Sequence, residues 1–309
     1  MAHMDVVFPD ESELPLRVED GRIYCPGVGD DTACLVCLLL AGKNIAEHVD
    51  SPQWREIRRE DAPGLLLVCN AGEEGLGNLK GVHKICEDFG DRIERFCTFD
   101  SSLSSIVDRA VGSKRFRVRV RTRGGHSYDD FGNDNAIAGL ASLVGKLYGI
   151  RVPEGGKTTY NVGMISGGTS VNTIAQEAEM LYEFRSDRRE NLEYMERQFM
   201  EVFDRAKAEG MDVSFKVIGV RPCEGQVDPK RKQALSDWAH RVVEEMTGQA
   251  PKHCAGSTDC NIPLSLGIPS VCVGSFRGAG AHTWEEYVET DSLEEGYKVA
   301  FGMIFGSRD

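Results

Sequence analysis

The 309-residue sequence has no long apolar stretch and no excess of basic residues. Its longest apolar run near the N-terminus, residues 33–41, holds nine residues, whereas a membrane-spanning helix needs about 20. The chain does not open with the charged and apolar regions of a signal peptide. Lys and Arg number 36 against 49 Asp and Glu, a net charge of −13, and phosphate binding needs clustered basic residues. We expect a soluble, cytoplasmic protein with no nucleic-acid or membrane partner.

The cysteine spacing of a secreted disulfide scaffold is also absent, although the chain holds ten cysteines. A chain of this length does not need disulfides to fold, and most of its cysteines lie in apolar stretches. Cys34 and Cys37 have the CxxC spacing of a redox or zinc pair, and that role is the alternative. They fall in an apolar run at helical spacing, where free Cys packs as a small hydrophobic residue. We therefore interpret the thiols as reduced and structural.

The first hundred residues and the last ninety alternate strand and helix patterns. Runs rich in Val, Ile and Leu predict buried strands at residues 65–69, 95–99 and 269–273. Helical patterns follow the first of these runs and precede the last, at residues 231–246. This alternation is typical of an α/β fold with a mostly parallel sheet and helices on both faces.

The middle of the chain follows a different pattern. Residues 116–121 alternate strictly between polar and apolar, which predicts a strand with one wet face. Further predicted elements are a helix at 133–148, strands at 159–165 and 179–186, a helix at 192–209 and a strand at 212–220. The order β-α-β-β-α-β is that of a small ferredoxin-like α+β domain. We predict a larger domain at 1–111 and 222–309, with this domain inserted at 112–221.

Polar side chains fall just beyond the predicted strands or in the loops that follow them. They are His3 with Asp5, Asp30, Glu73 with Glu74, Asp100, and His282. Ligands of parallel sheets bind outside the carboxyl ends of the strands, where these loops converge. Histidines and carboxylates are ligands that zinc accepts, and one Asp can bridge two ions. Of two successive carboxylates, one can bind metal while the other stays free as a general base.

Each of these positions also has an ordinary explanation when it is taken alone. His3 would be a solvated residue near a terminus or a remnant of cloning. Asp30 would cap the helix that follows, and Glu73 with Glu74 would start another. His282 would be a loop residue, and Asp100 would belong to a turn. The joint order of the motifs is more specific than any one of them.

Six motifs, read in order, resemble the co-catalytic zinc aminopeptidase/aminoacylase family. They are HMD at 3–5, GVGDD at 27–31, GEEG at 72–75, FD at 99–100, GGHS at 124–127 and AH at 281–282. That family includes peptidase T-like tripeptidases, dipeptidases, glutamate carboxypeptidases and acylamino-acid deacylases. The resemblance runs from His3 to about Val288 and so covers nearly the whole chain.

The resemblance implies a role for each residue of the predicted site. It implies two Zn²⁺ ions, with Co²⁺ or Mn²⁺ as alternatives that suit the same ligands. Asp30 would bridge the ions, with a cis peptide bond to Asp31, and Glu73 would be the general base. Asp5 would be the carboxylate that orients the imidazole of His3. The terminal ligands would be His3, Glu74, Asp100 and His282.

The inserted domain would be a lid or dimerisation domain, which implies a homodimer. His126 would stabilise the tetrahedral oxyanion, with an ordinary loop histidine as the alternative. Arg185 would bind a substrate carboxylate through its planar fork, and would otherwise be a surface charge. The remaining substrate contacts implied by the resemblance are Asn172, Gly256 and Ser257.

Two departures from the family pattern bear on function. Family members usually carry some tens of residues before the His-x-Asp motif, which here begins at residue 3. Asp100 stands where many carboxypeptidase-like members carry Glu, and the resemblance then favours aminopeptidase or tripeptidase chemistry. We expect an enzyme, a zinc metallopeptidase that cleaves short peptides with a two-zinc activated water. The alternatives are an N-acyl amino acid deacylase and a non-catalytic remnant.

Overall fold

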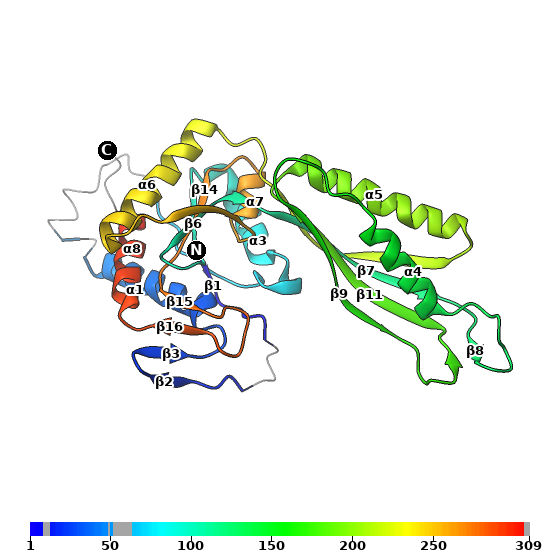
Figure 1. Ribbon diagram of the computed structural model, residues 1–309. Helices are drawn as coiled ribbons and strands as arrows, with labels where there is room; N and C mark the ends of the chain where they lie inside the picture. The colour runs from blue at the N-terminus through cyan, green and yellow to red at the C-terminus, as the bar shows by residue number, and fades with distance from the viewer. Residues whose placement is uncertain (9–12, 49, 52–63, 306–309) are drawn as a thin grey trace. The chain divides into compact units, whose positions relative to one another are not determined.

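The computed structural model describes residues 1–8, 13–48, 50–51 and 64–305. The chain forms two compact units. The first unit comprises Met1–Ala110 and Gly225–Asp309, and the second comprises Val111–Glu224. Figure 1 shows that both units contain sheets and helices. No helix in the described part of the chain is long and apolar enough to cross a membrane.

The first unit is built on a mixed sheet with the strand order β13-β6-β14-β5. The bounds are β13 Lys252–Gly256, β6 Ser105–Ala110, β14 Ser270–Val273 and β5 Phe96–Phe99. The β13–β6 and β14–β5 pairs are parallel, and the β14–β6 pair is antiparallel. Two further short strands, β1 (Ala2–His3) and β4 (Cys69–Asn70), form a parallel pair. The segment of β1 lies beside β5, where the Phe99 N–H donates to the Met1 carbonyl at 2.8 Å.

Alternation along these strands explains why helices cover both faces of the sheet. Val271 and Val273 pack into one core with α1 (Cys34–His48), α6 (Pro229–Thr247) and α8 (Ser292–Phe305). Cys272, between them, packs into another core with α3 (Lys80–Phe89) and α7 (Asn261–Ser265). Successive strand residues point to opposite faces, so an all-apolar strand is buried on both sides. The predicted α/β fold is confirmed.

A small antiparallel sheet in the first unit was not predicted. Its order is β15-β16-β3-β2, with bounds β15 Gly278–Ala279, β16 Tyr287–Glu289, β3 Arg22–Tyr24 and β2 Arg17–Glu19. The segment η1 (Val28–Ala33), which is kinked at the non-helical Asp30 and Asp31, follows β3 and leads into α1. This sheet places the segment after β15 beside the segment after β3.

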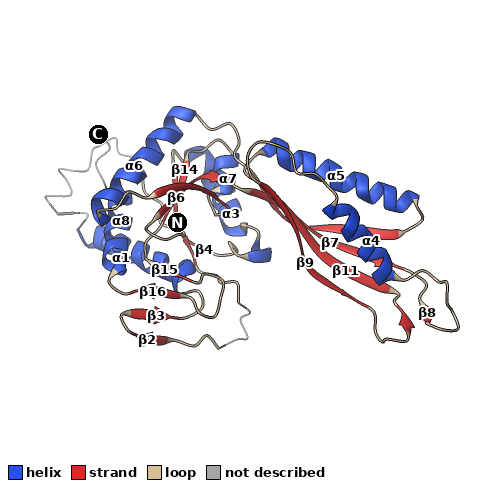
Figure 2. Cartoon of the chain, in the orientation of Figure 1, coloured by secondary structure: helices blue, strands red, loops and turns tan. Residues whose placement is uncertain are grey.

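The second unit is an antiparallel sheet of order β12-β7-β11-β9, with two helices on one face (Figure 2). The bounds are β7 Gly112–Arg121, α4 Ala136–Tyr148, β9 Thr158–Gly167, β11 Glu177–Ser186, α5 Arg189–Ala208 and β12 Asp212–Arg221. Two short strands, β8 (Gly125–His126) and β10 (Thr173–Ile174), pair separately. Phe116, Tyr182 and Phe199 form the centre of its buried core.

The opposite face of this sheet is wet and carries charged ladders, as the alternation of residues 116–121 predicts. Arg119 of β7 pairs with Glu179 of β11 at 2.8 Å, and Arg121 pairs with Glu177 at 2.9 Å. Opposite charges facing each other across strands stabilise the pairing modestly.

The predicted strand at residues 65–69 is wrong in its extent. The structure has a strand only at β4, Cys69–Asn70, and the side chains of Leu65, Leu66 and Leu67 are exposed. The partner strand β1 pairs with β4 through Ala2 and His3, and of the residues at 65–68 only Val68 bonds to it, its carbonyl accepting the Ala2 N–H at 3.2 Å. An apolar run therefore does not by itself make a strand.

Candidate metal centre

The parallel strands β1, β4 and β5 bring three of the predicted loops together. His3 ends β1, Glu73 and Glu74 follow β4, and Asp100 follows β5. Asp30 lies in η1, and His282 lies between β15 and β16. The carboxyl ends of neighbouring parallel strands meet at one edge of a sheet, so the side chains that follow them converge. All six residues belong to the first unit.

Asp30 stands between the two histidines. Its Oδ1 lies 3.1 Å from His3 Nε2, and its Oδ2 lies 2.9 Å from His282 Nε2. His3 Nε2 also lies 3.9 Å from Asp100 Oδ1, and His282 Nε2 lies 3.2 Å from Glu74 Oε1. Five of the six residues, all but Glu73, thus form two histidine–carboxylate sets that share Asp30.

The residues present fit a pair of divalent metal ions. His3, Asp30 and Asp100 offer ligand atoms within 4.8 Å of one another, and so do Asp30, Glu74 and His282. The atoms His3 Nε2, Asp30 Oδ1 and Glu74 Oε1 are buried and have no hydrogen-bond partner in the described structure. Buried polar atoms are normally satisfied, so atoms that face one another without a hydrogen bond are suited to coordinate a cation.

The carboxylates of the site perturb each other's protonation. Burial, together with the charges of Asp30 and Glu73, raises the pKa of Glu74 to about 7. Burial and the same two carboxylates raise the pKa of Asp100 to about 7. For Asp30, burial is outweighed by His3 and His282, which hold its pKa below the ordinary value. Without cations, the site therefore concentrates more negative charge than its histidines balance.

Glu73 is the fourth carboxylate of the cluster and is 4% exposed. A third set of candidate ligand atoms within 4.8 Å joins Glu73 with His3 and Glu74. Burial and the charge of Glu73 also raise the pKa of Asp259 to about 7. Glu73 therefore lies against one residue of each ligand set.

Asp5 differs from its expected role. The partner of His3 Nδ1 is the backbone carbonyl of Asp5 at 2.9 Å, while the Asp5 carboxylate lies 3.7 Å away. That carboxylate instead accepts backbone N–H groups from Gly72 at 2.8 Å, Glu73 at 3.2 Å and Glu74 at 2.9 Å. The chain leaves β1 after His3, so the i, i+2 geometry of a strand does not apply. Asp5 holds the loop of the paired glutamates.

His126 and Asn172 lie together within the second unit. His126 ends β8, and Asn172 precedes β10, its partner strand. The Asn172 carbonyl accepts the Ser127 N–H at 3.0 Å. The imidazole of His126 is about half exposed and lies 3.2 Å from an Asp129 carboxylate oxygen. Both side chains are therefore on a hairpin-like pair of loops rather than in the core.

Arg185 is not beside these two residues. It lies near the end of β11, opposite Ser113 of β7, whereas β8 follows the other end of β7. Its guanidinium donates to both carboxylate oxygens of Glu183, at 2.8 and 3.1 Å. In the structure Arg185 is thus an ion-paired residue of the wet face.

Gly256 ends β13 in the first unit, and Ser257 follows it. The same segment leads to Asp259, which is buried and accepts a hydrogen bond from the Asn70 side chain at 2.6 Å. Asn70 ends β4, two residues before the Gly72–Glu74 loop. The predicted substrate-contact segment is therefore tied to the strand that delivers the paired glutamates.

Asp31 makes a buried contact between the ligand loops that the sequence does not predict. Asp31 is 1% exposed, and its Oδ2 accepts the backbone N–H of His3 at 2.8 Å. The Asp30–Asp31 peptide bond is cis, as the resemblance implies. The adjacency of Asp31 to Asp30 was visible in the sequence, but its pairing with a residue 28 positions away was not.

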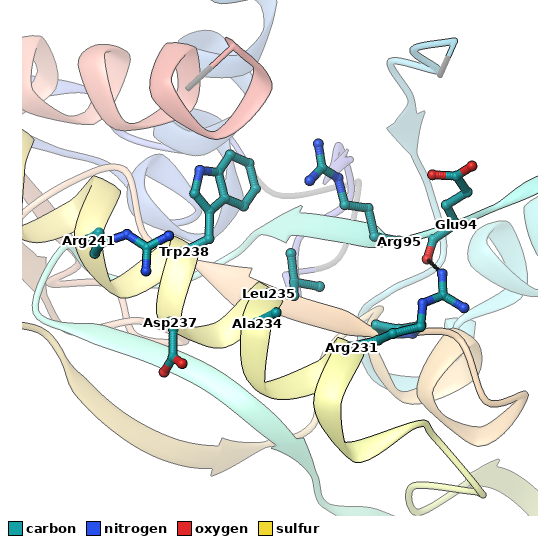
Figure 3. Close-up of a pocket in the computed structure, with 9 residues that line it drawn as sticks. Glu94, Arg95, Arg231, Ala234, Leu235, Asp237, Trp238 and Arg241 are labelled. Atoms are coloured by element: carbon teal, nitrogen blue, oxygen red, sulfur yellow. Dashed lines mark hydrogen bonds between the residues drawn. The ribbon is translucent and has the colours of Figure 1, made fainter. Parts of the chain in front are cut away.

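A cavity of about 520 Å³ in the first unit is separate from this cluster (Figure 3). Arg95, Arg231 and Trp238 are among its lining residues, and no candidate ligand is. Arg231 donates to the Glu94 carbonyl at 2.7 Å, and the Arg95 guanidinium lies over the Trp238 ring at 4.7 Å. The cavity is therefore not part of the candidate metal centre.

Comparison with known proteins defines the class of the molecule. The model of Peptidase family M20/M25/M40 matches residues 1–305. Acetylornithine deacetylase of Myxococcus xanthus is 26% identical over 307 residues, which cover 95% of this chain and 75% of that protein. Two crystal structures share the fold. Each match covers 98% of this chain and 78% of the chain in the crystal structure. They are aminopeptidase PepT of Bacillus cereus, 23% identical with a TM-score of 0.70, and a tripeptidase of Staphylococcus aureus, 22% identical with a TM-score of 0.72.

The chain belongs to the peptidase family M20/M25/M40. It is therefore a hydrolase of the peptidase and amidohydrolase kind, from a family that is generally metal-dependent. The family is the one that the order of the sequence motifs indicates.

Proposed function

We propose that the protein is a two-zinc hydrolase that cleaves an amide bond in short peptides. The observation that carries the proposal is Asp30, whose two oxygens each face a different histidine, at 3.1 and 2.9 Å. Asp30 would bridge the ions. His3 with Asp100 would complete one ligand set, and Glu74 with His282 would complete the other. Co²⁺ or Mn²⁺ would suit the same ligands.

The catalytic base in this proposal is Glu73. Two ions held by these residues would polarise the scissile carbonyl and would lower the pKa of a bound water to about 7. Glu73 takes the proton of the attacking water and delivers it to the leaving amine. Asp5 supports this step, because its carboxylate fixes the backbone N–H groups of Glu73 and Glu74. We assign His126 as a hydrogen-bond donor to the oxyanion, since its side chain is about half exposed.

The substrate class has two candidates. Tripeptides are favoured by the resemblance at Asp100 and by the fold shared with PepT and the tripeptidase. N-acyl amino acids are favoured by the acetylornithine deacetylase that is 26% identical over most of its length. Asn172, Arg185, Gly256 and Ser257 are proposed to contact either substrate.

A substrate panel tests the proposal. Zinc-loaded protein is assayed with free-amine tripeptides and with N-acetyl amino acids, each before and after removal of metal by a chelator. Hydrolysis of tripeptides that is lost on chelation and restored by zinc is the expected result. Preference for N-acetyl amino acids would select the deacylase, and hydrolysis that survives chelation would contradict the metal mechanism.

We also propose that the second unit is a lid or dimerisation domain. Strand β9 is an edge strand of its sheet, and Met164 and Ile165 at its end are 65% and 58% exposed. An edge strand with exposed apolar side chains is a surface suited to pairing with another chain. A homodimer through this strand is the arrangement that the proposal favours.

A further inference from the structure

Glu286 is buried against the loop that carries Asp30. The residue is 2% exposed and lies four positions after His282. Its Oε2 accepts the Gly27 N–H at 2.7 Å, and its Oε1 accepts the N–H groups of Gly29 and Asp30, both at 2.8 Å. One carboxylate therefore binds three backbone donors within four residues, and the last of them is the amide of Asp30 itself.

The loop is shaped to receive this carboxylate. Gly27 has φ of +76°, a left-handed conformation that glycine adopts without steric cost. A Cβ at Gly29 would lie 2.7 Å from the Phe276 ring and 3.0 Å from Glu286 Oε1. Converging N–H groups of neighbouring residues form a concave site for an anion. Glycine at both positions lets the anion approach from within the protein.

The position of Glu286 is itself fixed by the small sheet. Its carbonyl accepts the Cys25 N–H at 3.1 Å, and the next residue, Tyr287, pairs with Tyr24 of β3. The Thr283 carbonyl accepts the Glu286 N–H at 3.4 Å, which closes the turn after His282. Glu286 thus belongs to the segment of His282 and binds the loop of Asp30.

We propose that Glu286 is a positioning residue that sets the bridging Asp30 against His282. The two ligand side chains lie 2.9 Å apart, although they are more than 250 residues apart in the chain. Asp5 holds the Glu73–Glu74 loop in the same manner, with three backbone N–H groups on one carboxylate. The inference rests on the proposed function, because it treats Asp30 and His282 as metal ligands.

The test is the zinc affinity of Glu286→Gln. The amide keeps the shape of the side chain, but its nitrogen is a donor and faces a backbone N–H. Substitution of a residue that orients metal ligands typically lowers metal affinity about 10- to 100-fold. We expect Glu286→Gln to lower zinc affinity by a factor of that size. Chelator competition measures the dissociation constants, and the visible spectrum of the Co²⁺-loaded protein reports the change in geometry. The matched control is Glu285→Gln, at the neighbouring exposed position, which should bind zinc as the wild type does.

A double-mutant cycle separates positioning from general stability. If Glu286 acts through Asp30, Glu286→Gln should add little to the loss of affinity in Asp30→Asn. Folding is checked by circular dichroism, and Glu286→Asp provides a second variant that keeps the charge but shortens the reach. A folded Glu286→Gln protein with wild-type zinc affinity and cobalt spectrum would overturn the inference. Failure of both Glu286 variants to fold would overturn it too, because the residue would then serve the fold rather than the ligands.

Zinc binding by the wild-type protein distinguishes failure of the proposed function from failure of the proposed role of Glu286. If wild-type protein binds no zinc, the proposed function fails. If wild-type protein binds two zinc ions and Glu286→Gln binds them equally well, only the role of Glu286 fails.

Discussion

At the scale of single residues, backbone N–H groups decide where the candidate ligands stand. Asp5 and Glu286 each place a carboxylate on the backbone of a ligand loop. The ligands themselves make few hydrogen bonds, and the buried His3 Nε2 and Glu74 Oε1 have no hydrogen-bond partner among the described residues. The loops are thus held in place by residues other than those that would hold metal.

Glu73→Gln tests the general base. The amide has nearly the same size but cannot accept the proton, so we expect zinc content to stay near the wild-type value. Turnover of a tripeptide should fall about 10²- to 10⁴-fold, the range of general acid–base catalysis. Steady-state kinetics and metal analysis measure both quantities. Glu87→Gln, on the exposed face of α3, is the control. Near-normal turnover in Glu73→Gln would remove the residue from the mechanism.

The pH dependence of the metal-free protein follows from Glu74 and Asp100. Their folded-state pKa values rise to about 7 from ordinary values of 4.5 and 3.8. The folded protein then binds more protons than the unfolded chain between those values, so the free energy of unfolding falls as pH rises through this window. We expect the Tm of metal-free protein to be lower at pH 8 than at pH 5, with zinc reversing the loss.

Glu74→Gln provides the comparison for this profile, because the amide does not titrate. Its Tm should decline less with pH than that of the wild type, and Glu87→Gln should follow the wild type. Identical pH profiles for wild type and Glu74→Gln would contradict the assignment.

At the scale of elements, the ends of a few strands position the site. Strands β1, β4 and β5 end at or just before candidate ligands. In the second unit, α4 begins at a residue that caps it, because Asn135 Oδ1 accepts the N–H groups of Ile137 at 2.9 Å and Ala138 at 3.3 Å. This cap satisfies donors that the first turn leaves unpaired.

Asn135→Ala should destabilise the second unit by about 1 kcal/mol, the usual cost of losing a cap. Chemical denaturation followed by circular dichroism measures the change. Ser142→Ala, on the exposed side of the same helix, should stay within about 0.5 kcal/mol of the wild type. Equal stability of Asn135→Ala and wild type would show that the cap does not contribute.

Long periodic segments could be predicted from the sequence, and short strands could not. The alternation of residues 116–121 predicted the core of β7, and the structure extends it to Gly112–Arg121. Strands β3 and β16 have three residues each, and Arg22 of one pairs with Glu289 of the other. Because these residues are far apart in the chain, no local sequence pattern predicts the two strands. The same holds for the site: its ligand types and order were visible, but Glu286 and the carboxylate of Asp5 act on backbone amides that carry no sequence signal.

At the scale of the whole molecule, the candidate ligands belong to one unit, and three residues predicted to contact the oxyanion or the substrate belong to the other. All five predicted ligands lie in the first unit, and His126, Asn172 and Arg185 lie in the second. Each unit has its own apolar core. A substitution on the surface of the second unit should therefore leave the metal ligands in place.

Ile165→Lys tests the proposed dimer. A charge on the exposed end of edge strand β9 disfavours pairing with another chain. We expect light scattering to give twice the chain mass for the wild type and a single chain mass for the variant. Leu266→Lys, at an exposed apolar position of the first unit, should remain dimeric. A wild-type protein that is monomeric at micromolar concentration would contradict the proposal.

We propose above all that this chain holds two zinc ions between His3, Asp30, Glu74, Asp100 and His282. The most direct measurement is the metal content of purified protein after equilibration with zinc and removal of free metal, with peptide hydrolysis assayed on the same sample. We predict about two zinc ions per chain together with hydrolysis of short peptides. Less than half an equivalent of zinc, even after zinc has been added, would contradict the account and favour a non-catalytic member of the family.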